Sequence, residues 1–368
     1  MLPDEEGFLQ PVVDAAKCVH CGKCEVVCPV LHPGKPRKPL AVYAAKAKDD
    51  ELRWGSASGG VFTVLAQDVL KRGGVVFGAG FERPTWRVIH KAATNEEELD
   101  DLRGSKYVQS DTGDTFKEAK SYLDAGREVL YSGCPCQVAA LKSFLGTDYP
   151  NLLTVDLICH GVPSPWAWEK YLEDRIREFG GRKISRVLPR RYCVWQDFSI
   201  KLKIDGVPAA TYCQNASNDA YMISFGRWWT LRECCYSCRF KRFRSGAAVT
   251  LGDYSGRYLS DSSVCDDLGV SVAFVNTDVG RRVWGAVAST MTIQDTDMTD
   301  VSRQNPCVRT STVRSRLRNK FYECLRQMRF DDAVREVGKN RECGIVHHLL
   351  WWCKRLIVNF EWNHIQWT

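Results

Sequence analysis

Four cysteines near the amino terminus place the strongest constraint on how this chain can fold. They follow the spacing Cys-x2-Cys-x2-Cys-x3-Cys-Pro, at Cys18, Cys21, Cys24, Cys28 and Pro29. This spacing suits a [4Fe–4S] cluster, because three closely spaced thiolates let one short loop wrap three corners of the cube. Gly22 allows the backbone to come close to the cluster. The run therefore predicts an iron–sulfur cluster rather than a zinc ion.

The run stands alone, which leaves two explanations open. In two-cluster ferredoxins the fourth cysteine of each run ligates the other cluster, so such units have two runs. Residues 4–18 resemble the connector that joins two runs. Either a second run precedes this connector, or one cluster has been lost. As the chain stands, the four cysteines of the run are the simplest ligand set.

Cysteine is also the residue type that stands out in the composition, with 17 in a chain of 368 residues. The first residues, MLPDEEGF, are acidic and contain no apolar signal-peptide core. We therefore expect a cytoplasmic protein, in which clustered cysteines act as metal ligands or catalytic thiols rather than as disulfides. No stretch reaches the roughly 18 apolar residues that a membrane-spanning helix needs.

The net charge of +7 is moderate, and basic residues cluster at 182–191, 239–244 and 314–320. The simplest interpretation is a solvated surface. A functional interpretation is the attraction of an anionic cofactor, an anionic substrate or an acidic partner protein. Nucleic acid is not an expected partner, because these runs lack interleaved aromatic residues in any recognisable module.

A linker rich in proline and lysine, residues 32–39, separates the cysteine run from the rest of the chain. Beyond it, short apolar runs alternate with helical periods, which indicates an α/β or α+β fold. The expected helices cover 60–72, 116–123, a stretch after Cys136, and 313–328. The expected strands cover 75–81, 128–131, 152–158 and 198–204. The tryptophan-rich stretch 345–367 predicts a packed helix, with a membrane-surface or subunit-docking role as the alternative.

A second group of cysteines lies in turn-like contexts far apart in the sequence. Its members are Cys136, Cys159, Cys235 and Cys238, with Cys134 and Cys234 as adjacent spares. A Cys-x2-Cys pair by itself indicates either zinc or an iron–sulfur cluster. The presence of the first run favours a second cluster.

Five short motifs occur in the order seen in the coenzyme F420 hydrogenase/dehydrogenase beta-subunit family, which the chain resembles over about residues 15–256. The motifs are Ser58-Gly59-Gly60-Val61, Gly104-Ser105-Lys106-Tyr107, Cys134-Pro135-Cys136-Gln137, Cys235-Tyr236-Ser237-Cys238 and Val249–Asp253. The same family includes 7-hydroxymethyl chlorophyll a reductases of plants and divinyl reductases of cyanobacteria. The resemblance therefore does not fix the substrate.

The resemblance implies roles for individual residues. The implied ligands of a second [4Fe–4S] cluster are Cys136, Cys159, Cys235 and Cys238. The residues implied to approach FAD are Ser58, Gly59, Gly60, Val61, Ser105, Lys106 and Tyr107. The chain departs from the family at Cys134, where threonine is commoner, so the ligand of this pair stays open; we favour Cys136. Cys234 and Cys235 pose the same question.

Simple physical arguments support these roles, and each has a plainer alternative. A glycine turn that opens a helix offers free backbone N–H groups and a positive dipole end to a pyrophosphate, but it is also an ordinary helix cap. Lys106 could stabilise an anionic reduced flavin, or be a surface lysine. His160 could tune the site or be structural, and the default for Asp253 is helix capping or loop bracing.

The predicted organisation has three parts. Residues 1–32 form a ferredoxin-type segment, 40–260 a mixed-sheet domain that binds flavin and an iron–sulfur cluster, and 261–368 a largely helical extension. No catalytic side chain can be named from the sequence.

The predicted function is an oxidoreductase that couples one-electron transfer, from ferredoxin or a partner subunit, to two-electron chemistry at FAD. The substrate it reduces or oxidises could be coenzyme F420, which is anionic. The alternatives are a ferredoxin-dependent reductase of another organic substrate and an electron-relay subunit of a larger redox complex. A zinc-stabilised binding module is a fourth, remote alternative. The sequence leaves the direction of electron flow and the oligomeric state open.

Overall fold

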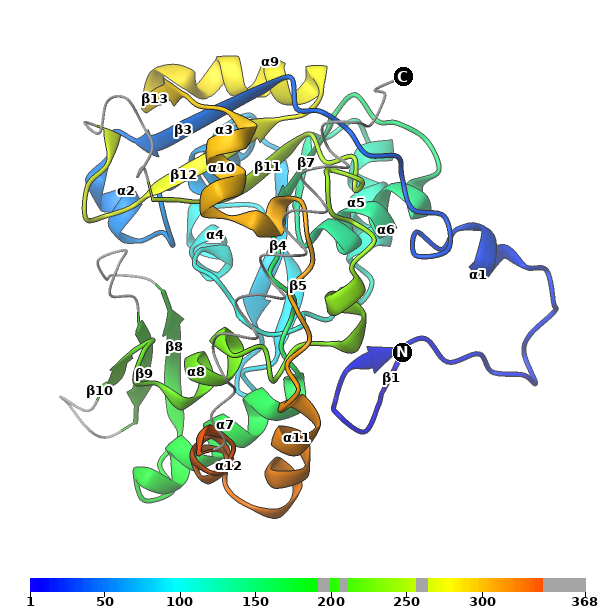
Figure 1. Cartoon of the computed structure of the whole chain (residues 1–368). Helices are drawn as coiled ribbons and strands as arrows, with labels where there is room; N and C mark the ends of the chain where they lie inside the picture. The colour runs from blue at the N-terminus through cyan, green and yellow to red at the C-terminus, as the bar shows by residue number, and fades with distance from the viewer. Residues whose placement is uncertain (191–198, 206–210, 256–263, 340–368) are drawn as a thin grey trace.

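A computed structural model describes residues 1–190, 199–205, 211–255 and 264–339 of the chain. Its described part contains one large sheet, a three-stranded sheet and a short amino-terminal hairpin (Figure 1). Phe198, which we expected at the start of a strand, lies outside these residues, as does the tryptophan-rich stretch 345–367. Within the described residues, none of the helices has both the length and the apolar character needed to cross a bilayer.

The large sheet has eight strands in the order β13-β3-β12-β11-β7-β6-β4-β5. Its strands are β3 (Ala41–Ala47), β4 (Val75–Phe81), β5 (Val88–Ala93), β6 (Val129–Ser132), β7 (Leu152–Leu157), β11 (Val249–Tyr254), β12 (Val270–Val275) and β13 (Met291–Asp295). The four strands β4, β6, β7 and β11 are mutually parallel, and every other pairing is antiparallel. The predicted mixed α/β sheet is therefore confirmed.

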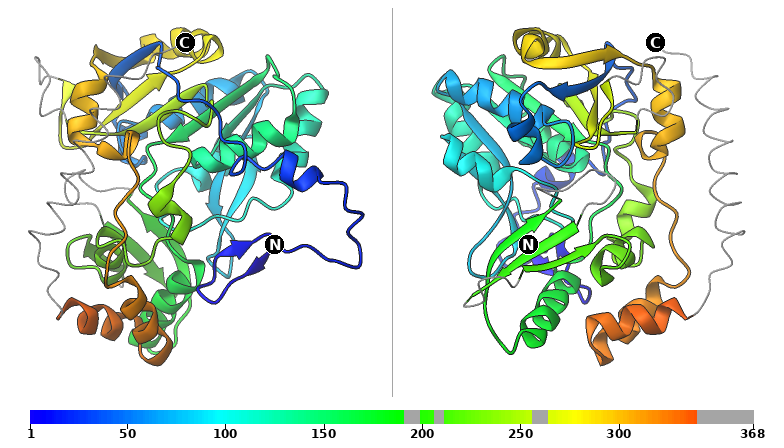
Figure 2. Two further views of the ribbon diagram at one scale, coloured as in Figure 1. Left: turned by 45° about the vertical axis from the view of Figure 1, so that its right-hand side comes forward. Right: turned by 90° about the vertical axis from the view of Figure 1, so that its left-hand side faces the viewer.

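Helices cover both faces of this sheet (Figure 2). They are α2 (Asp50–Trp54), α3 (Val61–Lys71), α4 (Glu96–Leu102), α5 (Thr115–Asp124), α6 (Pro135–Leu145), α9 (Asp278–Val287) and α10 (Met298–Gln304). Successive residues of β4 point to opposite faces, so Val76 packs with α3, α4 and α9, whereas Phe77 packs with α5 and α6. Both residues are fully buried, which explains why β4 reads as a continuous apolar run.

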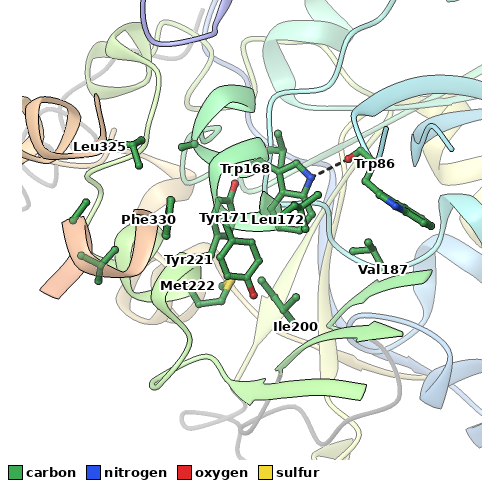
Figure 3. Packing of buried hydrophobic residues seen from close by; sticks show 14 of the residues in the cluster. Trp86, Trp168, Tyr171, Leu172, Val187, Ile200, Tyr221, Met222, Leu325 and Phe330 are labelled. Carbon is green, nitrogen blue, oxygen red and sulfur yellow. Dashed lines mark hydrogen bonds between the residues drawn. The ribbon is translucent and has the colours of Figure 1, made fainter. Parts of the chain in front are cut away.

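A second lobe packs below the sheet around an aromatic core. Its elements are β8 (Ile184–Pro189), β9 (Ser199–Ile204), β10 (Thr211–Asn215), α7 (Pro165–Glu178), α8 (Ala220–Gly226), α11 (Arg318–Gln327) and α12 (Phe330–Gly338). Figure 3 shows Tyr171 and Tyr221 between Trp168 and Phe330. Trp168 donates its Nε1 hydrogen to the carbonyl oxygen of Trp86 at 2.9 Å, which ties this core to the large sheet.

The amino-terminal segment begins with the hairpin of β1 (Leu2–Pro3) and β2 (Leu9–Gln10). It then leaves the body as an extended stretch and returns past the one-turn helix α1 (Lys23–Val26), as Figure 1 shows. Two short 3-10 helices, η2 (Glu233–Ser237) and η5 (Pro306–Val308), precede β11 and α11 in the chain. The backbone of Arg242 bonds both to Arg37 of the returning segment and to Val308 of η5, which places η5 beside that segment.

Most of the expected elements are found. The strand expected at 75–81 has the same bounds in the structure, and the helix expected at 60–72 is α3. The helix expected from residue 313 begins only at Arg318, because residues 311–315 have no regular secondary structure and residues 316 and 317 form a turn before it. We expected a largely helical extension after residue 260; its described part contains α9, α10, α11 and α12, and it also contributes β12 and β13 to the large sheet. β12 is fully buried there, which its sequence allows because every residue except Ser271 is apolar.

Candidate functional site

A cavity of about 320 Å³ lies at the carboxyl ends of the parallel strands. Gly78 of β4, Ser132 of β6, Leu157 of β7 and Leu251 of β11 all line it. Open α/β sheets bind their ligands at this edge, and the volume is within the range of sites for small organic ligands. The position follows from topology, because the four parallel strands deliver their following loops to one place.

The serine–glycine turn at residues 58–61 forms one wall of the cavity. Ser58, Gly60 and Val61 line it, and α3 begins at Val61. Ser58 Oγ donates to the carbonyl oxygen of Val270 at 2.9 Å, which fixes the turn against β12. Gly60 has φ of +78°, a conformation that favours glycine. The positive end of an 11-residue helix thus faces the cavity, an arrangement that fits the phosphates of a dinucleotide.

Gly59 has a different role from its neighbours, because it contacts the sheet rather than the cavity. A Cβ atom at this position would lie 2.4 Å from the carbonyl oxygen of Ala45 and 2.7 Å from the backbone nitrogen of Ser271. Both contacts are with backbone of adjacent strands, which cannot move aside. Packing against these strands explains why glycine is required at position 59. The predicted approach of Gly59 to FAD stays a prediction.

We expect Gly59→Ala to lower the free energy of unfolding by about 2–3 kcal/mol, the usual cost of overpacking a rigid site. The matched control is Gly78→Ala, where the new Cβ would meet Leu102 at an ordinary 3.5 Å. Urea unfolding of both variants measures the difference. Equal stabilities for the two variants would contradict the packing role of Gly59.

The second predicted flavin segment, residues 105–107, also lines the cavity. Lys106 Nζ donates to the carbonyl oxygen of Arg103 at 2.8 Å. The Tyr107 hydroxyl accepts a hydrogen bond from Nη1 of Arg190 at 3.2 Å, and the same nitrogen lies 2.7 Å from Oδ2 of Asp253. Burial raises the pKa of Tyr107, while the adjacent Arg190 cation acts in the opposite direction. Tyr107 is therefore neutral, and its hydroxyl accepts the hydrogen bond from Arg190 in the cavity wall.

Arg190 is a site residue that the sequence did not reveal. Its side chain is buried in the cavity wall, and burial disfavours its charge, but Tyr107 and Asp253 hold its pKa above the ordinary value. Its φ of +51° is in the left-handed region, which non-glycine residues enter mainly at turns and functional sites. Asp253, expected to cap a helix or brace a loop, pairs with this cation at the turn that follows β8.

His90 of β5 is a second lining residue that was not expected. Its Nε2 lies 3.0 Å from the carbonyl oxygen of Ser132, so Nε2 carries the hydrogen. The ring stacks on Tyr131 with centroids 5.5 Å apart. Burial lowers the pKa of His90 to about 4, so the imidazole is neutral at physiological pH. A buried alternating strand gives no sequence signal for this placement.

Asp156, near the end of β7, is a buried carboxyl group in the cavity wall. Its Oδ2 accepts from Ser245 Oγ at 2.6 Å and its Oδ1 from Thr250 Oγ1 at 2.5 Å. Burial nevertheless raises its pKa from 3.8 to about 7. The folded state therefore binds this proton more tightly than the unfolded state does.

The raised pKa of Asp156 predicts a pH dependence of stability. Its contribution is complete below pH 4 and is lost as pH rises through about 7, which amounts to up to about 4 kcal/mol at roughly 1.4 kcal/mol per pKa unit. Asp156→Asn should flatten the slope of unfolding free energy between pH 4 and 7, whereas Asp148→Asn, at a side chain 96% exposed, should not. Urea titrations of the apo chain at several pH values measure the slope. An unchanged slope in the first variant would contradict the assignment.

The second cysteine group comes together beside this cavity. Cys134 starts α6, Cys159 follows β7, and Cys235 lies in η2. The sulfur atoms of Cys134 and Cys159 are 4.0 Å apart, and both residues line the cavity. Cys136 interacts electrostatically with Cys159 and Cys238.

The structure leaves the choice between neighbouring cysteines open. Cys134 is half-buried and faces Cys159, whereas Cys136 is exposed. Cys235 is half-buried and Cys234 exposed. The preference for Cys136 as a ligand stays a prediction.

His160 also lines the cavity, and burial lowers its pKa.

The thiolates of this group are soft ligands, which suit either zinc or an iron–sulfur cluster. In the described part of the chain, no three His, Cys, Asp or Glu side chains are arranged to hold one ion. The sulfur atoms of Cys134 and Cys159, 4.0 Å apart, are as close as two ligands of one zinc ion would be, so the cluster at this place stays a prediction.

The first cysteine run lies in the extended amino-terminal segment. Cys18 and Cys28 are half-buried, whereas Cys21 and Cys24 are exposed. Gly22 has φ of +68°, with nothing within 4 Å of a Cβ placed on it, and starts α1. An open backbone at this glycine fits the close approach that a cluster requires.

Three family models match the chain. One describes the amino-terminal part of the coenzyme F420 hydrogenase/dehydrogenase beta subunit and matches residues 42–117. One describes the carboxyl-terminal part of the same beta subunit and matches residues 126–300. A 4Fe-4S binding domain matches residues 10–33. Together they cover the second cysteine group, the first run and every residue that lines the cavity except Asn305.

Individual proteins resemble the chain more distantly. The F subunit of the F420H2 dehydrogenase of Methanosarcina mazei is 27% identical over 147 residues, which make up 39% of this chain and 41% of that relative. The match thus spans less than half of that relative. A chain of the F420-reducing [NiFe] hydrogenase complex from Methanosarcina barkeri, solved as a xenon derivative, has a TM-score of 0.52 and 16% identity. The match covers 83% of this chain and 94% of the hydrogenase chain, and at this identity it shows a shared fold.

Proposed function

This chain belongs to the coenzyme F420 hydrogenase/dehydrogenase beta-subunit family, and we propose that it is an iron–sulfur flavoprotein oxidoreductase. In this proposal ferredoxin or a partner subunit exchanges single electrons with a [4Fe–4S] cluster on Cys18, Cys21, Cys24 and Cys28. A second cluster, on the cysteines beside the cavity, relays them to FAD in the cavity. The proposed location is the cytoplasm, where free thiols persist.

The observation that supports this proposal most is that Cys134 and Cys159 share one cavity with the amino terminus of α3. A cluster and a flavin bound at these places would be neighbours, as electron exchange between them requires. Bound FAD supplies the conversion between one-electron and two-electron chemistry. The chain supplies the helix end for its phosphates and a wall that contains the neutral Tyr107 hydroxyl.

The proposed substrate is anionic, and coenzyme F420 is the first candidate. Arg190 presents a cation to the cavity, Lys106 lines the same wall, and the chain is basic overall. Family members named for F420 add to this choice. A ferredoxin-dependent reduction of another organic anion would use the same residues. A relay subunit, whose partner holds the substrate site, is the alternative in which the cavity takes no substrate.

The first test is the metal and flavin content of the full chain purified without oxygen. About eight irons with one FAD per chain would support two clusters that serve a flavin. About four irons with FAD would remove the first cluster from the proposal. Zinc in place of iron, without flavin, would overturn it.

The second test is turnover. The isolated chain, reduced with ferredoxin, is mixed with oxidised F420, and deazaflavin absorbance is followed. Reduction supports the proposed substrate. Oxidation of the flavin only by other organic acceptors would favour the second candidate, and turnover only after a co-purifying subunit is added would favour the relay.

A further inference from the structure

We propose that one stretch of the chain, residues 232–244, clamps both ends of the amino-terminal cysteine run and so joins the two cysteine groups into one electron-transfer unit. We call residues 11–29 the cysteine arm and residues 232–244 the clamp. The inference rests on the proposed function for the presence of two clusters. The clamp itself is argued from contacts of the chain alone.

The arm is anchored at its start through the hairpin. Nη2 of Arg232 donates to the carbonyl oxygen of Leu9 at 3.0 Å and to Oε1 of Gln10 at 2.6 Å. The hairpin is itself firmly seated, because Phe8 is 1% exposed in the aromatic core and the Glu6 carboxylate pairs with buried Arg318. The arm therefore starts from a fixed point beside η2.

The arm is anchored at its end by the same stretch. Nη1 of Arg239 donates to the carbonyl oxygen of Val30 at 3.0 Å. Further along, the N–H of Arg37 donates to the carbonyl oxygen of Arg242 at 3.1 Å. A Cβ atom on Gly34 would lie 2.4 Å from the carbonyl oxygen of Arg244, so the two backbones pass in direct contact.

The two anchors stand on either side of the second cysteine pair. Arg232 is the residue before η2, which contains Cys235, and Arg239 directly follows Cys238. The residues of the arm between the anchors are mostly exposed, and the hairpin and the Val30 end are what tie it to the body. A loop with both ends pinned has lost much of its conformational freedom before it binds anything. The clamp thus pre-organises the first run and holds both of its ends against the stretch that contains Cys235 and Cys238.

The opposite arrangement would be a free arm that swings between an external donor and the body. In that case the arginine contacts would be incidental, and their loss would change neither the protection of the arm nor its exchange with the second cluster. The clamp predicts that both change together.

The test compares the full chain with the double variant Arg232→Gln and Arg239→Gln. The control is Arg314→Gln, which removes a neighbouring surface arginine that bonds Glu233 and Asn319 and does not touch the arm. Two quantities are measured: tryptic cleavage at Lys17 and Lys23, and the spin–spin interaction between reduced clusters by electron paramagnetic resonance. Circular dichroism confirms that each variant folds.

The clamp predicts at least about tenfold faster cleavage of the arm in the double variant, the effect of losing about 1.4 kcal/mol of anchoring. It also predicts a weaker spin–spin interaction, with both quantities unchanged in the control. Unchanged cleavage, or faster cleavage with an unchanged interaction, would overturn it. Cleavage is also measured on the apo chain, so that the test of the clamp does not depend on the clusters. A chain that binds only one cluster would refute the proposed relay, and proteolysis would still decide whether the clamp exists.

Discussion

Replacing Cys159 with serine is expected to remove about four irons and four sulfides per chain and to leave the first cysteine run loaded. Cys159 is the member of the second group that interacts with Cys134, Cys136, Cys235 and Cys238. A serine hydroxyl is not ionised near neutral pH and is a harder ligand than a thiolate, so it does not replace the sulfur.

The same substitution should slow reduction of the flavin by ferredoxin on the order of 100-fold or more. Losses of groups that only support a metal ligand already cost 10–100-fold, and here a ligand itself is removed. Iron and sulfide analysis and rapid-mixing absorbance of the flavin measure the two effects. FAD content should change little, because the helix end that faces its phosphates is on α3.

Matched serine variants at Cys134 and Cys136 decide which of this pair binds the cluster. The variant that replaces the ligating cysteine should lose iron as Cys159→Ser does, whereas the variant of the other cysteine should keep it. Cys213→Ser, at an exposed residue of β10, is the control that should keep both clusters. A Cys159→Ser chain with its full iron content would refute the second cluster at this place.

Much of the fold could be predicted from the sequence, because neighbouring residues determine the most regular elements. β4 is a continuous apolar run, and two glycines separate it from the helix α3 before it. α3 has an apolar stripe and begins directly after a serine–glycine turn. The cysteine run at residues 18–28 has a spacing with one dominant chemical meaning. In each of these segments, the pattern that predicts the structure lies within about a dozen consecutive residues.

The missed residues owe their roles to contacts across long separations. Arg190 belongs to a run of basic residues that is typical of a solvated surface, and only the packing of the second lobe against the sheet brings it to Tyr107, 83 positions away. His90 sits in an edge strand whose pairing with β4 turns it toward the cavity. The strands β12 and β13 were missed as parts of the sheet because both pair with β3, more than 200 residues earlier.

Arg190→Met is expected to raise KM for an anionic substrate by about 10- to 100-fold, with a smaller change in kcat. Methionine keeps the length and apolar stem of the side chain but removes the cation. A hydrogen bond to a charged group contributes about 1.5–3 kcal/mol, which is the free energy behind this range. Asp253 is left without its partner, but at 35% exposure water can solvate its carboxylate, so the chain should still fold and keep its flavin.

The selective part of this prediction is the charge of the substrate. Arg190→Met should leave the rate with an uncharged electron acceptor within about twofold of the parent, whereas Arg190→Lys should recover part of the loss with the anionic substrate. Arg186→Met is the control: Arg186 lies on β8, the strand that ends directly before Arg190, but it pairs with Asp100 outside the cavity. Steady-state kinetics with both acceptors measure the difference. An equal loss with charged and uncharged acceptors would mean that Arg190 supports the shape of the cavity, and the anionic substrate would lose its main support.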